Sequence, residues 1–146
     1  MTRDDSFYMK EALREARRAL EEGEIPIGAV VVSPRGDIIG RGHNLTETLR
    51  DVTAHAEMQA LTAATQTLGG KYLQGCTLYV TVEPCVMCAG ALGWAQLSRL
   101  VFGAPDDKRG FRTFAPGALH PKCTVTAGVL EDECRALMQQ FFQSKR

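Results

Sequence analysis

The sequence predicts one domain, residues 1–146, of the α/β class, with helices on both faces of a central mixed five-stranded sheet in a three-layer α/β/α arrangement. Two observations predict this class. Short runs rich in β-branched residues alternate along the chain with segments whose apolar residues recur at helical spacing. A length of 146 residues is usual for one compact domain and allows a real core.

The first half of the chain predicts a helix, a hairpin and a second helix. Residues 4–26 begin with cap-type residues, repeat apolar residues at helical spacing and can end at Gly23. Residues 27–33 and 38–42 are apolar runs around a turn, which indicates a β-hairpin. Residues 53–70 predict a helix that Thr53 caps and two glycines close.

The second half continues the alternation of strands and helices. The strands expected here are residues 76–82, 99–104 and 123–129, and the helices are residues 84–96 and 130–146. Pro84 suits the first turn of its helix because proline lacks an N–H that would go unpaired there. Residues 105–122 contain several Gly and Pro residues and are expected to form a long loop.

Charge and hydropathy exclude several classes of protein. The 17 Lys and Arg residues balance the 17 Asp and Glu residues, unlike in a strongly basic nucleic-acid binder. No apolar run approaches 18 residues, so we expect no membrane-spanning helix and no membrane partner. The N-terminal residues lack the apolar stretch of a secretory signal, and we expect a cytoplasmic location.

The cysteines do not indicate a disulfide framework, because the chain has five and is expected to be cytoplasmic. Cys85 and Cys88 form a CxxC pair, for which metal ligation is the better interpretation. Buried thiols suit Cys76, Cys123 and Cys134.

The stretches "TAHAEM" (53–58) and "PCVMC" (84–88) predict a zinc site. Cys85 and Cys88 lie three residues apart at a predicted helix start, which places both sulfurs on one side of the first turn. The positive end of the helix lowers thiol pKa values, so both sulfurs are expected to be thiolates. His55 begins the preceding helix and can supply a third ligand, because zinc prefers Cys sulfur and His nitrogen.

Three protein ligands leave a fourth position of tetrahedral zinc for water, which is typical of catalytic rather than structural zinc. Glu57 follows His55 by two residues, and the two face the same site only if His55 leaves helical φ/ψ. Glu57 would then take a proton from the water and pass it to the substrate.

Other interpretations of these motifs stay open at this point. A lone CxxC can be a redox pair or half of a zinc ribbon, and a lone HxE can be an accident of a polar helix start. A structural zinc would need a fourth ligand from Cys76, Cys123, Cys134, His43 or His120, none of which belongs to a second paired motif. The two motifs together, at two helix starts separated by one strand, favour a catalytic zinc.

The HAE and PCxxC motifs resemble the signature of the zinc-dependent nucleobase and nucleoside deaminases, the cytidine/deoxycytidylate deaminase superfamily. More narrowly, the chain resembles the bacterial tRNA-specific adenosine deaminases. The similar segments cover most of the chain: "GEIPIGAVVV", "GHN", "TAHAEMQAL", "TLYVTVEPCVMCAGAL", "RLVFGA", "AGVLEDEC" and "FFQSKR". The resemblance implies a cytidine deaminase-like fold.

The resemblance also implies an activity. His55, Cys85 and Cys88 would hold one Zn²⁺ per subunit, and a zinc-activated water would attack C6 of adenine. Glu57, as proton shuttle, would protonate a ring nitrogen and help ammonia leave. The product would be inosine at the wobble position of the tRNA anticodon, and the family's homodimer would bind the anticodon stem-loop.

Three further residues match the substrate pocket of that family. Asn44, in "HN", would bind the base edge through its amide, although a turn residue after the second strand is the plainer interpretation. Ala56 would let its backbone approach the ring. Pro84 belongs to the same pocket, but its role at a helix start is sufficient to explain it.

The loop at 105–121 departs from the family pattern, which is Lys-x-Gly-small followed by a Ser and a Met-Asp pair. Because this loop borders the substrate pocket in the family, the identity of the nucleic-acid substrate stays open. Basic and aromatic residues suit single-stranded RNA through phosphate pairing and stacking. A solvated loop over buried rings, or merely solvated terminal charges, would have the same composition. The candidate RNA contacts are Lys108, Arg109, Phe111, Arg112, Phe142, Lys145 and Arg146.

The helix after PCVMC carries Met87, Leu92, Trp94 and Leu97, which belong either to the core or to a dimer interface.

Three functions remain open from the sequence. The first is wobble adenosine deamination in tRNA, and the second is deamination of a free base or nucleoside, such as guanine or cytosine, with the same zinc chemistry. The third is a non-catalytic, zinc-stabilised interaction module, against which Glu57 argues.

Overall fold

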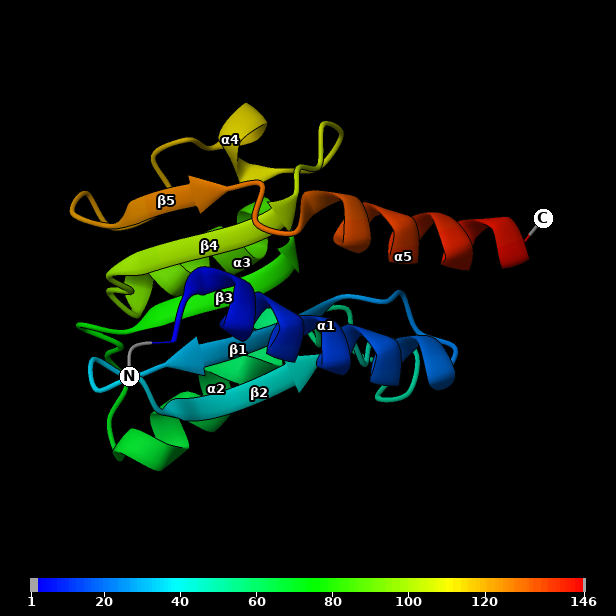
Figure 1. The fold of residues 1–146 in the computed structure, drawn as a ribbon. Helices are drawn as coiled ribbons and strands as arrows, with labels where there is room; N and C mark the ends of the chain where they lie inside the picture. Colours follow the sequence, from blue (N-terminus) through cyan, green and yellow to red (C-terminus); the bar gives the residue numbers. More distant parts are fainter. Residues whose placement is uncertain (1–2, 146) are drawn as a thin grey trace.

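The strands and helices follow one another in the predicted order in the computed structural model, which describes residues 3–145 (Figure 1). The strands are β1 (Gly28–Val32), β2 (Ile38–His43), β3 (Thr77–Val82), β4 (Arg99–Ala104) and β5 (Thr124–Ala127). The helices are α1 (Asp5–Glu21), α2 (Ala56–Leu68), α3 (Val86–Trp94), α4 (Phe111–Phe114) and α5 (Glu131–Ser144). Within residues 3–145, no helix is long and apolar enough to cross a membrane.

The five strands join one mixed sheet in the order β2-β1-β3-β4-β5. β1 pairs antiparallel with β2, which confirms the hairpin, and also antiparallel with β3. β3, β4 and β5 run parallel to one another, and helical connections join them. The parallel part therefore brings the carboxyl ends of β3 and β4 to one edge of the sheet, where ligands commonly bind in α/β folds.

Helices cover both faces of the sheet, which confirms the three-layer prediction. α1 and α5 lie on one face, and α2 and α3 lie on the other (Figure 1). The buried strand β1 shows the alternation directly, because Val30 packs with the α1 and α5 side whereas Val31 packs with the α2 and α3 side. Every residue of β1 is buried, as expected for a β-branched run covered on both faces.

Small residues let α2 lie unusually close to β2. A Cβ atom on Gly42 would lie 2.5 Å from the backbone oxygen of Ala56 and 2.5 Å from the backbone nitrogen of Ala60. Gly40 meets the next turn of the helix in the same way, at Ala60 and Ala64. This contact fixes the height of α2 over the sheet, and with it the position of the first residues of the helix.

Three local features differ from the sequence predictions. Thr53 does not cap α2, because its N–H and hydroxyl both donate to the Asp51 carboxylate at 2.8 and 2.7 Å in the preceding turn. His55 occupies the N-cap position instead. Pro84 lies one residue before the N-cap of α3 rather than in its first turn, and the predicted loop at 105–122 contains the short helix α4.

The close approach of α2 to β2 predicts that Gly42→Ala destabilises the fold. The added methyl group meets backbone atoms that cannot rotate away, and overpacking of this kind costs about 1–3 kcal/mol. Gly70→Ala is the matched control, because a Cβ atom there has no heavy atom within 4 Å. Urea unfolding should show a lower free energy of unfolding for Gly42→Ala alone. Equal stability of the two variants would contradict this account of the packing.

Candidate metal and active site

Two helix starts meet at the carboxyl end of β3 and bring together the predicted ligands. His55 is the N-cap of α2 and Cys85 is the N-cap of α3, both with extended backbone, and Cys88 lies in the first turn of α3. The Nδ1 atom of His55 lies 3.6 Å from the Cys85 sulfur and 3.4 Å from the Cys88 sulfur. The three ligand atoms all lie within 4.8 Å of one another.

These three atoms have the spacing that tetrahedral zinc requires. Zn–S and Zn–N bonds of the usual length, at the tetrahedral angle, separate a sulfur from a nitrogen by about 3.5 Å. The two measured nitrogen–sulfur distances, 3.6 and 3.4 Å, agree with this value. The donor set, one imidazole nitrogen and two sulfurs, also matches the preference of zinc. The residues therefore fit a zinc ion.

Glu57 shares the site because His55 leaves the helix. His55 has φ −74° and ψ 157°, so its ring points to the same region as the side chain two residues later in the first turn of α2. Glu57 is 4% exposed, so its carboxyl group is buried beside the metal cluster. Burial raises the pKa of Glu57 to about 7, which suits a group that must both accept and donate a proton near neutrality.

The two sulfurs differ in their affinity for a proton. A hydrogen bond from Cys88, aided by His55, lowers the pKa of Cys85 to about 4 against the effect of burial. The hydrogen bond to Cys85, burial and the nearby Glu57 carboxyl raise the pKa of Cys88. A bound zinc ion would favour the thiolate form of both sulfurs, because thiolates are the form in which cysteines ligate zinc.

A cavity of about 560 Å³ opens in front of this cluster. Glu57, His55 and Cys85 line its inner part. Its outer walls come from segments far apart in the sequence: Ile25 and Ile27 before β1, Val52, Met87 on α3, Arg109, and Met138 and Phe142 on α5. Figure 1 shows why α5 contributes, since its last turns extend past the ends of β3 and β4. The site is therefore open enough for a ligand larger than a water molecule and a metal ion.

A smaller recess of about 100 Å³ holds the predicted base-binding residues. Asn44 and Ala56 line it together with His55 and Glu57. Asn44 is 5% exposed, and its backbone N–H donates to the Ile27 carbonyl at 3.1 Å, which holds the residue beside Glu57. Pro84 is buried beside Cys85, and its carbonyl accepts a hydrogen bond from the Phe111 N–H at 2.9 Å.

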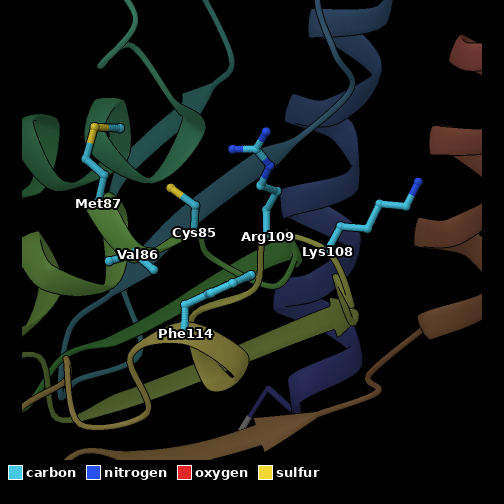
Figure 2. Close-up of a pocket in the computed structure, with 6 residues that line it drawn as sticks. All are labelled: Cys85, Val86, Met87, Lys108, Arg109 and Phe114. Atoms are coloured by element: carbon cyan, nitrogen blue, oxygen red, sulfur yellow. The ribbon is translucent and has the colours of Figure 1, made fainter.

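The candidate RNA contacts of the 105–122 loop do not share one environment. Lys108 and Arg109 line a second cavity of about 480 Å³ with Cys85, Met87 and the exposed Phe114 (Figure 2). Phe111 is 2% exposed and packs in the core on the α2 and α3 side, so its ring is not available for base stacking. The expectation for Phe111 is corrected by this burial.

Arg112 also has an internal partner. Its guanidinium lies 3.1 Å from the Glu83 carboxylate and 4.7 Å from the centre of the Phe102 ring.

The candidate RNA contacts near the C-terminus lie on or near α5. Phe142 is 50% exposed on the cavity wall, and the Lys145 ammonium lies 5.2 Å from the Phe141 ring. Arg146 lies outside the described residues.

Sequence reasoning missed two buried carboxylates that hold the walls of the site. Glu83 accepts hydrogen bonds from the backbone N–H groups of Asp106 and Arg112, and Glu24 accepts them from the backbone of Glu47 and Thr48. A charged residue directly beside a motif, as Glu83 is beside PCVMC, was the available signal. Met138 gave none, because one apolar residue of an amphipathic helix looks like any other.

Fold and site together define a zinc-dependent deaminase. The chain belongs to the family described by the cytidine and deoxycytidylate deaminase zinc-binding region, whose model matches residues 2–104. A tRNA-specific adenosine deaminase of Aquifex aeolicus is 51% identical over an alignment of 145 residues that covers 96% of this chain and 95% of that protein.

Two solved structures are similar over nearly the whole chain. The first comes from work on A-to-I editing by tRNA:A34 deaminases at the wobble position of transfer RNA. Its TM-score is 0.84 at 43% identity, over 90% of this chain and 99% of that one. The second is a guanine deaminase from Nitrosomonas europaea, with a TM-score of 0.84 at 29% identity, over 97% of this chain and 85% of that one.

The ligand geometry predicts that Cys88→Ser abolishes zinc binding. Serine keeps the shape of the side chain but loses the soft sulfur ligand, and we expect the zinc affinity to fall by more than about 100-fold. Cys76→Ser is the matched control, because Cys76 is also buried but lies outside the cluster. Metal analysis after dialysis should give one zinc per chain for the control and near none for Cys88→Ser. Full zinc in Cys88→Ser would contradict the assignment.

Proposed function

We propose that this protein deaminates adenosine to inosine at the wobble position of a tRNA anticodon. The observation that carries a deaminase activity is the buried Glu57 carboxyl beside the three donors His55, Cys85 and Cys88. The choice of tRNA as substrate is supported by the relatives, since both the Aquifex aeolicus protein and the first solved structure are described as tRNA deaminases. A tRNA substrate also agrees with the cytoplasmic location predicted from the sequence.

Each residue of the site has a part in this reaction. His55, Cys85 and Cys88 would hold one zinc ion per subunit, and that ion would supply activation of a water for attack on C6 of adenine. Glu57 accepts a proton from that water, donates it to a ring nitrogen and then helps protonate the leaving amino group, which departs as ammonia.

The recess beside Glu57 would orient the base. The Asn44 amide has a donor and an acceptor, so it can pair with the edge of the purine. The methyl side chain of Ala56 is small enough to let the purine ring approach the backbone. Glycine would be smaller still, but it would make the helix start more flexible. Pro84 and its carbonyl contact to Phe111 keep the wall next to Cys85 in place.

The anticodon stem-loop would lie along the outer rim of the cavity. The charges and the exposed ring for a single-stranded RNA loop would come from Lys108, Arg109, Phe142 and Lys145. Arg146 stays a candidate from the sequence alone, because it lies outside the described residues. Arg112 serves the rim indirectly, through its ion pair with Glu83. The balanced net charge of the chain is compatible with this mode because the cations needed are local.

A second candidate function is deamination of a free base such as guanine. It is favoured by one finding, the TM-score of 0.84 with the Nitrosomonas europaea guanine deaminase.

One experiment separates the two functions. Purified protein is incubated with a stem-loop RNA carrying a wobble adenosine, and separately with guanine, cytosine, adenosine and cytidine, while ammonia is measured. Release from the RNA alone supports the tRNA function. Release from a base or nucleoside alone supports the second candidate, and no release from zinc-loaded protein points to an interaction module.

The proton-shuttle role predicts that Glu57→Gln keeps zinc but loses turnover. The amide has nearly the same shape as the carboxyl, yet it cannot accept and return a proton, and loss of such a group costs about 10²–10⁴-fold in kcat. Glu21→Gln, at an exposed position of α1, is the control and should keep full activity. Zinc content and single-turnover rates are measured together. Near-normal turnover by Glu57→Gln would refute the role.

We also propose that two copies of the chain associate through α3. Leu92 and Leu97 are buried in the core, whereas Trp94 is 86% exposed and Val86 and Met87 are exposed on the same helix. An exposed tryptophan in an apolar patch marks an interaction surface.

Trp94→Arg should therefore shift the protein from dimer to monomer in sedimentation velocity, because a charge replaces the largest apolar contact of the patch. Val125→Arg, which places the same charge on the half-exposed β5, is the control and should stay dimeric. A Trp94→Arg protein that sediments like the control would contradict this interface.

A further inference from the structure

The 105–110 segment is held rigidly against the metal cluster by backbone hydrogen bonds. The Asp106 N–H donates to the buried Glu83 carboxylate at 3.1 Å, and the Arg109 N–H donates to the Asp106 side chain at 3.0 Å. Gly110 pairs with the ligand Cys85 in an isolated β-bridge. The backbone at Arg109 is therefore fixed one residue away from a contact with the metal ligand, and the exposed side chain extends from this fixed point.

The guanidinium of Arg109 differs from that of its neighbour Arg112 in its partners within the described part of the chain. The Arg112 guanidinium is taken up by Glu83, with contacts of 3.1 and 3.2 Å. Within residues 3–145, no carboxylate lies in salt-bridge range of Arg109. An unpaired guanidinium offers several N–H donors in a planar fork, which matches the oxygens of a phosphate.

Arg109 also lies where two cavities next to the cluster meet. The cavity of about 560 Å³ and the cavity of about 480 Å³ have Cys85, Met87 and Arg109 in common. Figure 2 shows the Arg109 side chain rising next to Cys85, whereas Lys108 is directed away from it. A ligand that fills the first space and continues into the second must pass this guanidinium.

We infer that Arg109 binds a phosphodiester that flanks the target nucleotide and thereby selects a polynucleotide over a free base. The target nucleoside occupies the cavity that contains Glu57, and the adjoining nucleotide follows into the second cavity. A free base carries no phosphate and gains nothing from Arg109. This inference rests on the proposed function, because it names what distinguishes the substrate at that same site.

The test pairs substitutions in the protein with a neutral linkage in the RNA. Stem-loop RNAs are made with a methylphosphonate, which lacks the phosphate charge, at the 5′ or the 3′ linkage of the wobble adenosine. Wild-type protein should lose roughly tenfold or more in kcat/KM at one of the two positions, as expected for a charge-assisted hydrogen bond. Arg109→Ala should show a similar loss on unmodified RNA and no further loss on the methylphosphonate RNA.

Two control variants separate this contact from general charge effects. Lys108→Ala removes a neighbouring cation but should retain the penalty for the neutral linkage, and Arg109→Lys should retain part of it. A penalty of equal size in wild type and Arg109→Ala, or no penalty at either linkage in wild type, would overturn the inference. Failure of the wild type to deaminate the unmodified RNA would instead overturn the proposed function, so the two failures are distinguishable.

Discussion

The active centre depends on two N-cap residues whose extended backbone turns their side chains toward each other. His55 and Cys85 stand just outside the regular turns of α2 and α3, where a side chain can point along the helix axis instead of away from it. Each also stands at the positive end of its helix, which favours anionic sulfur and a carboxylate nearby. Were either helix one residue longer at its start, the nitrogen and the sulfurs would no longer face one ion.

That arrangement in turn depends on how closely the helices approach the sheet. Gly40 and Gly42 present no side chain to α2, so the helix lies against β2 with its backbone in contact. α3 enters directly from β3, which carries its first residues to the sheet edge. The ligand distances of 3.4 and 3.6 Å thus follow from packing on both sides of the site, and no disulfide or long loop is needed to hold the ligands.

The sequence allowed most of the fold and the centre of the site to be predicted, and the physical reasons are local. Strands and helices can be identified from the spacing of apolar residues, because burial of one face imposes that spacing. The HAE and PCVMC motifs predict the ligand positions, because residue spacing at a helix start determines where these side chains point. Features that depend on a distant partner were not readable in the same way. Thr53 was predicted to cap α2, because no sequence pattern shows that its hydroxyl donates to Asp51 instead. Phe111 was predicted to stack on RNA bases, because the core residues that bury its ring come from other elements of the chain.

The way in which Glu83 holds the rim has a consequence for the evolution of this fold. Its carboxylate accepts main-chain N–H groups at Asp106 and Arg112, and every residue type except proline supplies such a donor. Exposed side chains along this segment can therefore drift while the course of the backbone stays the same. The segment beside the metal cluster is thus held in place by its backbone, whereas its exposed side chains take no part in holding it. A single scaffold can on this basis acquire new targets by changing a few outward residues, without risk to the chemistry behind them.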